Sequence, residues 1–244
     1  MPRGNRGPRR TRVNRLRACG LERYTRKKRG NTMQTRRHFT GLALASVFGS
    51  ALLDVSSWTR RLWAATRKVL AAGTDRKSLI HEDPATLDAS NLEVTPLESF
   101  ETMGPTDRAI DIATWRLDVT GQVGTPMSLT YAQLTALPSL ERNVLLICPG
   151  VFVNHGRWKG FSVQNILQQA TFDRTATRVT FEEARGKSAS YPIADVLSGK
   201  VFLAYQVNGV PLPRKHGFPL RVVAEDYYGA DWVKYVSRVR VEKG

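Results

Sequence analysis

Apolar and polar residues follow one another in short runs from Trp115 to the end of the chain. Trp115–Val119 alternates between the two types, which predicts a strand with one buried face. Val144–Cys148 is apolar almost throughout and is stopped by Pro149 and Gly150, so it predicts a buried strand that ends on a cysteine. Further strands are expected at Thr177–Phe181, Val201–Val207, Leu220–Val223 and Val233–Val241.

Three short segments have helical spacing. Tyr131–Leu137 follows two candidate capping residues, Ser128 and Thr130, and is stopped by Pro138. The other two helices are expected at Ser162–Ala170 and Ile193–Leu197. Many short strands, few short helices and no internal repeat favour the α+β class, with mixed sheets in a single domain. The chain has neither a G-x-G-x-x-G motif nor a P-loop.

The first 90 residues differ in character from the rest. Residues 1–34 are rich in Arg, Lys, Gly and Asn and predict a basic disordered leader, upstream of an alternative start at Met33. Residues 35–57 resemble an export signal, because the pair Arg36-Arg37 precedes the apolar run Gly41–Leu53. Residues 58–90 are expected to be a linker and residues 91–244 the folded domain.

The signal predicts where the protein works. Paired arginines with Phe39 two residues on are typical of the twin-arginine route, which exports proteins already folded. A chance pair in an arginine-rich leader is the alternative. We therefore expect a periplasmic protein, with Trp58–Lys68 as either the start of the linker or a retained membrane anchor.

The charge is concentrated at one end of the chain. The 244 residues have a formal net charge of +16. Residues 1–80 hold 20 of the 37 Lys and Arg residues and 3 of the 21 acidic ones, so residues 81–244 hold 17 basic and 18 acidic residues. A protein that binds nucleic acid needs basic residues on the binding domain itself, so we expect no nucleic-acid partner.

Cys148 is the only cysteine of the expected domain, because Cys19 lies in the leader. One thiol cannot form a disulfide framework, and neither a zinc motif nor the C-x-x-C-H motif of covalent haem is present. Three interpretations of Cys148 stay open. It is an inert core thiol, a nucleophile paired with His155 or His216, or a thiolate ligand of a soft redox metal.

Polar residues gather near this cysteine in the sequence. Asn154, His155 and Arg157 follow it in a stretch expected to be a loop, so they are candidates for a substrate pocket. His216 lies near Arg221 and two further cations, a composition that suits a phosphate or another anion. A solvated basic turn is the alternative for this second stretch.

Five motifs follow one another along the chain. They are W-R-L-D-V-T-G-x-V-x-x-P-x-x-L-T-Y at Trp115–Tyr131, C-x-G at Cys148 with N-x-x-R-W-K-G downstream, L-A-Y-x-x-N-G-V-P-L-P at Leu203–Pro213, H-G-F-P-L-R at His216–Arg221, and Y-G-x-x-W-V-K at Tyr228–Lys234. In this order they resemble the molybdopterin-binding domain of the sulfite oxidase superfamily. The branch that they resemble most is bacterial and includes the periplasmic methionine-sulfoxide reductase catalytic subunit.

The resemblance implies a molybdenum–molybdopterin cofactor, in which a molybdenum ion is held by a pterin dithiolene. It implies that Cys148 is the metal ligand and catalytic residue, and that Glu183 lies near another contact to the cofactor. The cofactor-binding residues that it implies are Phe100, Glu101, Cys148, His216, Arg221, Trp232, Val233 and Lys234.

The resemblance also implies an oxidoreductase that transfers an oxygen atom with two electrons. Sulfite oxidases carry an arginine soon after the ligand cysteine, whereas Pro149–Phe152 contains none. This difference favours a neutral small-molecule substrate such as a sulfoxide. The alternatives are a sulfite-oxidising dehydrogenase of the same fold, a non-catalytic pterin-binding module and a Cys–His hydrolase. Because the chain has no haem domain, we expect a separate redox partner, either a membrane haem subunit or a cytochrome.

Overall fold

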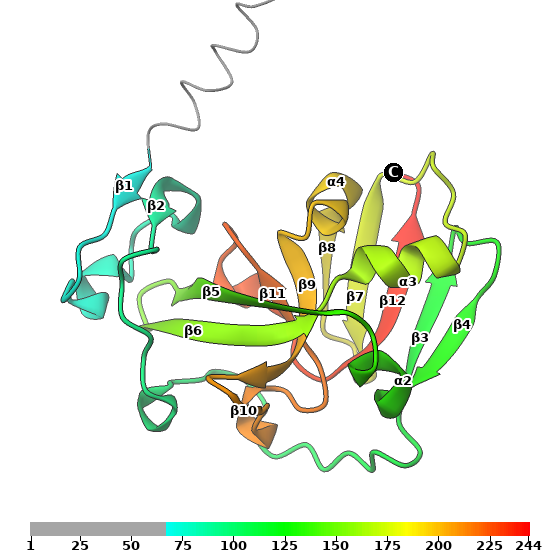
Figure 1. The fold of residues 1–244 in the computed structure, drawn as a ribbon, viewed down its shortest axis with the longest axis horizontal. Coiled ribbons are helices and arrows are strands. Elements are labelled where there is room, and N and C mark those ends of the chain that lie inside the picture. The colour runs from blue at the N-terminus through cyan, green and yellow to red at the C-terminus, as the bar shows by residue number, and fades with distance from the viewer. Residues whose placement is uncertain (1–66) are drawn as a thin grey trace, which may run out of the picture. The chain divides into compact units, whose positions relative to one another are not determined.

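The computed structural model describes residues 67–244, so the predictions for the leader, the signal and residues 58–66 lie outside the described residues. Two five-stranded sheets form most of this part (Figure 1). The first contains, in spatial order, β10 (Val210–Pro211), β9 (Val201–Val207), β6 (Phe152–Phe161) and β5 (Ser139–Cys148), with β11 (Arg221–Ala224) also paired with β9. The second contains β4 (Met127–Thr130), β3 (Arg116–Gly121), β12 (Val236–Glu242), β7 (Arg178–Glu183) and β8 (Ser188–Pro192).

The helices are few and short, as the spacing of apolar residues predicts. They are α2 (Tyr131–Thr135), α3 (Val163–Gln169) and α4 (Ile193–Leu197). Thr130 caps α2 in a capping box with Gln133, and Ser162 caps α3. Mixed sheets with short helices confirm the α+β class. No helix in residues 67–244 is both long and apolar enough to cross a membrane.

The stretch after Cys148, expected to be a loop, is instead strand β6. Only a turn at residues 149–151 separates it from β5, and the two strands pair antiparallel from Cys148–Phe152 back to Ser139–Phe161. Nine of its ten residues are at least partly buried, so the alternation that identifies a strand is missing from its sequence. Gly156 and Gly160 further lower its apparent strand propensity. The placement of the three polar candidates in a loop is therefore wrong.

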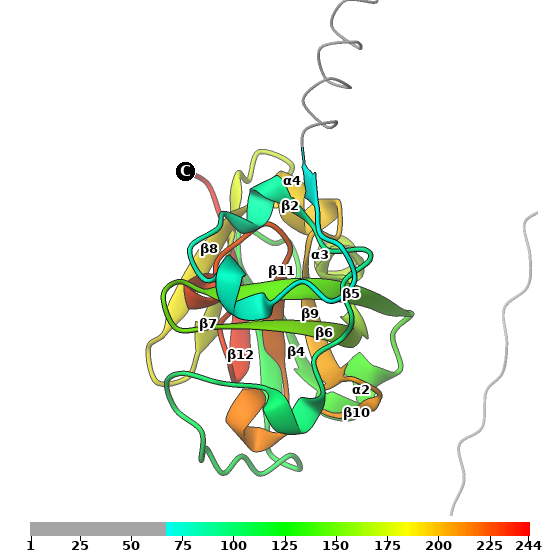
Figure 2. The same ribbon diagram turned by 90° about the vertical axis from the view of Figure 1, so that its left-hand side faces the viewer.

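Residues 67–90, expected to be part of a linker, pack onto the first sheet instead. Figure 2 shows this segment crossing in front of β5 and β6. It contains a small parallel sheet of β1 (Lys68–Val69) and β2 (Leu87–Asp88) and two short 3-10 helices, η1 (Arg76–Leu79) and η2 (Pro84–Thr86). A second hydrophobic cluster joins it to the hairpin; its buried members are Leu70, Leu79, Leu87, Leu92, Leu145, Ile147 and Val153. Isolated leucines in a polar stretch have no periodicity, which is why the pattern missed this packing.

The main hydrophobic core contains side chains from both five-stranded sheets and from α3. Trp158 and Phe161 from β6 are fully buried in it, as are Phe181 from β7 and Phe202 from β9. Val236, Val239 and Val241 of β12 enter the same core. The sheets are thus fixed to each other, so side chains at their edges keep defined positions.

Gly160 is expected to be required for the pairing of β6 with β9. A Cβ at this position would lie 1.9 Å from the carbonyl oxygen of Leu203, at a register shift between the strands. We predict that Gly160→Ala lowers the free energy of unfolding by about 3 kcal/mol or more, because backbone must move to relieve the clash. Urea unfolding measures the effect. Gly124→Ala is the control, since its nearest contact is 3.4 Å; an equal loss in both variants would contradict this account.

Candidate functional site

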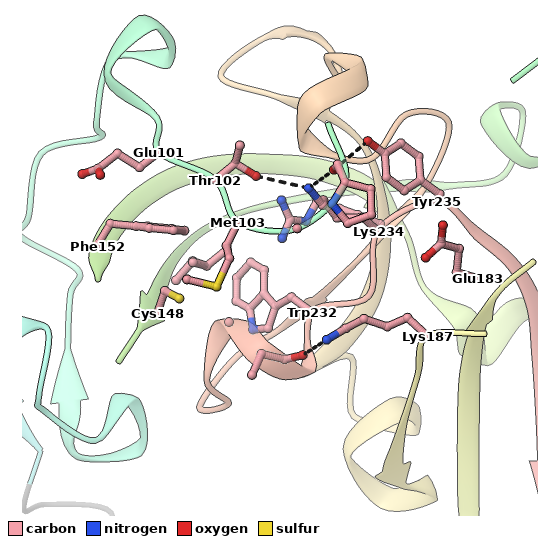
Figure 3. Close-up of a pocket in the computed structure, with 16 residues that line it drawn as sticks. Glu101, Thr102, Met103, Cys148, Phe152, Glu183, Lys187, Trp232, Lys234 and Tyr235 are labelled. Carbon is pink, nitrogen blue, oxygen red and sulfur yellow. Dashed lines mark hydrogen bonds between the residues drawn. The ribbon is translucent and has the colours of Figure 1, made fainter. Parts of the chain in front are cut away.

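Cys148 lies at the end of β5 on the wall of a cavity of about 270 Å³, here called the Cys148 cavity (Figure 3). The other walls come from residues 101–105, from the end of β7 and from the segment before β12. These segments are far apart in the sequence, so only the packing of the two sheets brings them together. Of the predicted site residues, Glu101, Cys148, Arg221, Trp232 and Lys234 line this cavity, as does Glu183.

The thiol of Cys148 is half-buried and free. Burial raises its pKa, so the group is a protonated thiol at neutral pH unless a cation stabilises the thiolate. In the described part of the chain no hydrogen bond joins it to His155 or His216. A metal ion deprotonates a thiol that coordinates it, so this position suits a metal ligand better than an activated nucleophile.

Arg221 is a buried cation on the wall of the same cavity. It is 5% exposed, and its Nη1 donates to the carbonyl oxygen of His216 at 3.1 Å. Its guanidinium carbon lies 5.0 Å from the ring centre of Trp158 and 5.6 Å from that of Trp232. Its Nε has no hydrogen-bond partner, and no carboxylate within residues 67–244 pairs with it. Because a buried cation without a counter-ion is unfavourable, the cavity is suited to an anion.

His216 lies directly behind this cation and is 1% exposed. Burial, and then the charge of Arg221, lower its pKa to about 3, so the imidazole is neutral at physiological pH. Its ring meets Phe100 edge-on at 5.7 Å, and its Nε2 is buried without a partner. A neutral ring nitrogen in this position can form one further hydrogen bond.

Gly217 allows the two cationic segments to approach each other. Its φ is +109°, and a Cβ there would lie 2.9 Å from the Cβ of Lys234, so a side chain would be both strained and obstructed. Arg221 and Lys234 pair as an isolated bridge between the two segments. The glycine of the H-G-F-P-L-R motif thus lets β11, which carries Arg221, and the segment before β12, which carries Lys234, lie side by side.

Lys234 connects the last segment to the wall formed by residues 101–105. Its Nζ donates to Thr102 Oγ1 at 3.3 Å, to the carbonyl oxygen of Lys215 at 3.0 Å and to that of Pro105. Burial, followed by repulsion from Arg221, lowers its pKa to about 8. The ammonium is therefore charged at neutral pH but close to losing its proton.

The far wall carries two residues with different roles (Figure 3). Glu183 forms an ion pair with Arg108 at 2.6 Å, with both side chains largely buried, so its charge is neutralised. Lys187, in the turn after β7, donates to the carbonyl oxygen of Ala230 at 2.8 Å. Sequence reasoning missed Lys187, because a lysine in a turn gives no signal that separates it from an ordinary surface charge. It also missed Met103, Phe152 and Tyr235, although each lies within a few residues of a predicted site residue.

The polar residues of β6 lie outside the lining of the Cys148 cavity. The Asn154 side chain donates to the carbonyl oxygen of Glu101 at 2.8 Å and accepts from its N–H at 3.2 Å. The backbone of His155 exchanges hydrogen bonds with Thr95, and the exposed Arg157 side chain lies 3.7 Å from a surface carboxylate. These residues hold neighbouring segments to the strand, and only Asn154 acts on the cavity, through its wall.

Phe100, His216 and Val233 stand behind the lining residues. Phe100 packs on both His216 and Trp158, with ring centres 5.7 and 6.0 Å away. Val233 is fully buried, and its carbonyl accepts from the N–H of Val222 at 2.8 Å. They support the positions of the residues that face the cavity.

Residues 103–244 match a protein family described as the oxidoreductase molybdopterin binding domain. Mitochondrial sulfite oxidase of Rattus norvegicus is 34% identical in an alignment 163 residues long that covers 54% of this chain and 30% of that protein. The uncharacterized oxidoreductase YuiH of Bacillus subtilis is 32% identical over 131 residues, 52% of this chain and 66% of that protein. A nitrate reductase of Hordeum vulgare is 27% identical in an alignment 218 residues long that covers 75% of this chain and 24% of that protein.

A solved structure supports the fold. The sulfane dehydrogenase SoxCD from Paracoccus pantotrophus superposes with a TM-score of 0.54 at 22% identity, over 62% of this chain and 46% of that one. This likeness concerns the fold alone. The present chain spans 30% to 42% of the length of the sulfite oxidases that it matches.

Anion binding in the Cys148 cavity should weaken as Lys234 loses its proton. Sulfate keeps its charge between about pH 7 and about pH 9, so any change in its affinity over this range comes from a change in the protonation of the protein. We predict that its affinity for the full chain falls about tenfold over this range, because the pKa of Lys234 is depressed to about 8. Isothermal titration calorimetry measures this. Lys234→Met should bind weakly at all pH values, and Lys243→Met, which removes a charge elsewhere, should follow the parent chain; a pH-independent affinity in the parent would refute the assignment.

Proposed function

This chain belongs to the oxidoreductase molybdopterin binding domain family, and on that premise we propose that it is a molybdenum–molybdopterin enzyme that reduces a sulfoxide or a similar neutral oxide. The superfamily resemblance seen in the five motifs is confirmed by the match over residues 103–244. The observation that carries the proposal is the meeting, in one cavity, of a half-buried thiol and a buried cation without a counter-ion.

The residues present fit this cofactor. Cys148 would offer a soft sulfur ligand for molybdenum, and the unpartnered Nε of Arg221, on the cavity wall, would offer a polar contact to the pterin and its phosphate. His216 stands behind this wall, and its unpartnered Nε2 has one hydrogen bond free. Lys234 would supply a second positive charge for the phosphate. Glu101 and Trp232 border the cavity, with Phe100 and Val233 supporting them from behind.

The cofactor, once bound, would supply the two-electron redox chemistry of molybdenum. The chain would supply charge, orientation and exclusion of water. Arg221 and Lys234 bring positive charge into the site, and because the site is poorly accessible to water, their electrostatic attraction for an anion is strong. His216 stays neutral and acts only through hydrogen bonds. Trp232 and Phe152 are 2% and 6% exposed, so they limit the access of water beside Cys148.

The turn after Cys148 supports a neutral substrate. Residues 149–151 are Pro, Gly and Val, so this turn contributes no cation to the cavity. A sulfite-oxidising dehydrogenase is the second candidate. It is favoured by Lys187, an exposed cation on the cavity wall that could meet an oxyanion. A small oxide reaching the same cavity would need no such charge.

We also propose that electrons come from a separate protein, either a membrane haem subunit or a cytochrome, and that the chain works in the periplasm after twin-arginine export. The Arg36-Arg37 pair supports the export route. Fractionation of cells that produce the full chain, with the arginine pair changed to lysines in a parallel strain, tests the location.

The proposed function predicts what happens when Cys148 is changed. The full chain, produced in a host that makes the cofactor, should contain stoichiometric molybdenum and should reduce sulfoxides with a viologen donor faster than it oxidises sulfite. Cys148→Ser should lower the turnover at least about 100-fold, since a hard oxygen ligand replaces a soft sulfur. Metal analysis of the purified chain, together with assays of sulfoxide reduction and sulfite oxidation, tests this prediction. An absence of molybdenum, or unchanged turnover in the variant, would refute the proposal, and preferred sulfite oxidation would select the second candidate.

Arg221 is expected to retain the cofactor. Arg221→Met keeps much of the length of the side chain but removes the charge, so pterin recovered from the purified chain should fall about tenfold or more. Fluorescence of the released, oxidised pterin measures this without any assay of activity. Arg178→Met, at an exposed position of β7, is the matched control and should retain its pterin. Equal pterin content in the two variants would be inconsistent with the assigned role.

A further inference from the structure

The residues that line the Cys148 cavity divide into a buried floor and an exposed rim. Cys148 is half-buried, and three buried side chains share the floor with it: Leu146, Phe152 and Trp232. The exposed residues of the lining form the rim; they are Glu101, Met103, Gly104, Pro105, Lys187 and Ala230. A molecule that comes from solvent therefore passes the rim before it reaches the thiol.

One part of the rim is the segment 101–105, here called the strap, which has no regular secondary structure. Hydrogen bonds hold both of its ends. The Asn154 side chain donates to the carbonyl oxygen of Glu101 at 2.8 Å and accepts from its N–H at 3.2 Å. At the other end, the carbonyl oxygen of Pro105 accepts from the Tyr235 hydroxyl at 3.0 Å and from Lys234 Nζ. Moving the strap away from the cavity would break these bonds, whereas rotation of a strap side chain breaks none of them.

Met103 is the largest apolar side chain on the rim and comes from the middle of the strap. It is 56% exposed although it lines the cavity, so it lies where the cavity meets solvent. Figure 3 shows it reaching from the strap toward Cys148, while the carboxylate of Glu101 points away from the cavity. Methionine is unbranched and has three rotatable bonds, so its side chain fills an irregular opening and adjusts to what passes.

The space behind Met103 is small. The Cys148 cavity has a volume of about 270 Å³, whereas ligand sites usually have volumes of about 300–1,000 Å³. Under the proposed function the cofactor occupies part of this volume. The few side-chain atoms at the rim therefore decide how large a substrate body fits beside Cys148.

We propose that Met103 determines the size of substrate that this site accepts: its side chain admits a small, uncharged oxide to Cys148 and excludes oxides with bulky substituents. This inference rests on the proposed function and makes its substrate class more specific. Because Met103 acts through its volume, a side chain of similar volume preserves the selection and a shorter one relaxes it.

Shortening Met103 tests this inference in the enzyme that holds its cofactor. The probes are dimethyl sulfoxide and dibenzyl sulfoxide. The measured quantity is the ratio of kcat/KM for the bulky oxide to that for the small one, which does not depend on the fraction of chains that hold the cofactor. Met103→Ala should raise this ratio at least about tenfold.

Two variants serve as controls for this measurement. Met103→Leu keeps nearly the same volume, and Val151→Ala shortens another exposed apolar side chain, three residues from Cys148 but outside the cavity lining. Both should keep the ratio of the parent chain. An unchanged ratio in Met103→Ala, or an equal rise in Met103→Leu, would overturn the inference.

Alkylation of Cys148 tests the same inference without turnover. The full chain is produced without the cofactor and with Cys19→Ser, so that Cys148 is its only cysteine. The probes are iodoacetamide and N-(1-pyrenylmethyl)iodoacetamide, which carry the same reactive group on bodies of different size. Mass spectrometry of the labelled chain measures the rates. The rate with the bulky reagent relative to the small one should rise about tenfold in Met103→Ala and stay unchanged in Met103→Leu and Val151→Ala. A relative rate that does not respond to Met103→Ala would contradict the inference.

The two measurements separate this inference from the proposed function. Alkylation that responds to Met103→Ala, in a chain that reduces no oxide when it holds its cofactor, would overturn the proposed function and leave the role of Met103 standing. Reduction of oxides, with neither ratio responding to Met103→Ala, would overturn the role of Met103 and leave the proposed function standing.

Discussion

The antiparallel pairing of β5 with β6 is the constraint on which the rest of this structure depends. Its register, from Ser139–Phe161 to Cys148–Phe152, places the cysteine at the tip of the hairpin. The other edge of β6 pairs with β9, which in turn pairs with β11, so the hairpin also determines where Arg221 begins its strand. A shift of this register by one residue would turn Cys148 to the opposite face of the sheet, and the cavity would lose this residue from its wall.

The site depends on charges that the fold does not neutralise. Arg221 lies against two tryptophans that also contact each other, donates a hydrogen bond to a carbonyl oxygen, and lacks a carboxylate partner among the described residues. Burial of such a cation is unfavourable for folding, and the surrounding packing must offset that cost. An anion that enters the cavity would recover part of it as binding energy. The neighbouring ion pair of Glu183 with Arg108 differs, because its two charges already satisfy each other.

The segment before residue 103 is part of the site's architecture as well as of the core. Its leucines cover one face of the hairpin, and the backbone of Ile80 supports the turn that follows Cys148. The polar residues of β6 hold this segment in place, since Asn154 forms hydrogen bonds with Glu101 and His155 forms them with Thr95. The N-terminal segment, the turn and the cavity wall therefore form one connected unit.

What could be predicted from the sequence followed local rules. Ile193–Leu197 and Val201–Val207 have the predicted bounds, because helical spacing and a continuous apolar run are properties of adjacent residues. Cys148 and the cations near His216 were recognised from motifs whose order the fold preserves. The identity of β6 was missed, since both its faces are covered and the covering residues lie elsewhere in the chain. Only the tertiary structure brought Arg221 and Lys234 together with the thiol and placed Lys187 on the cavity wall. It also moved Asn154 from a presumed substrate contact to a support of Glu101, because the direction of a side chain depends on the register of its strand, and long-range pairing decides that register.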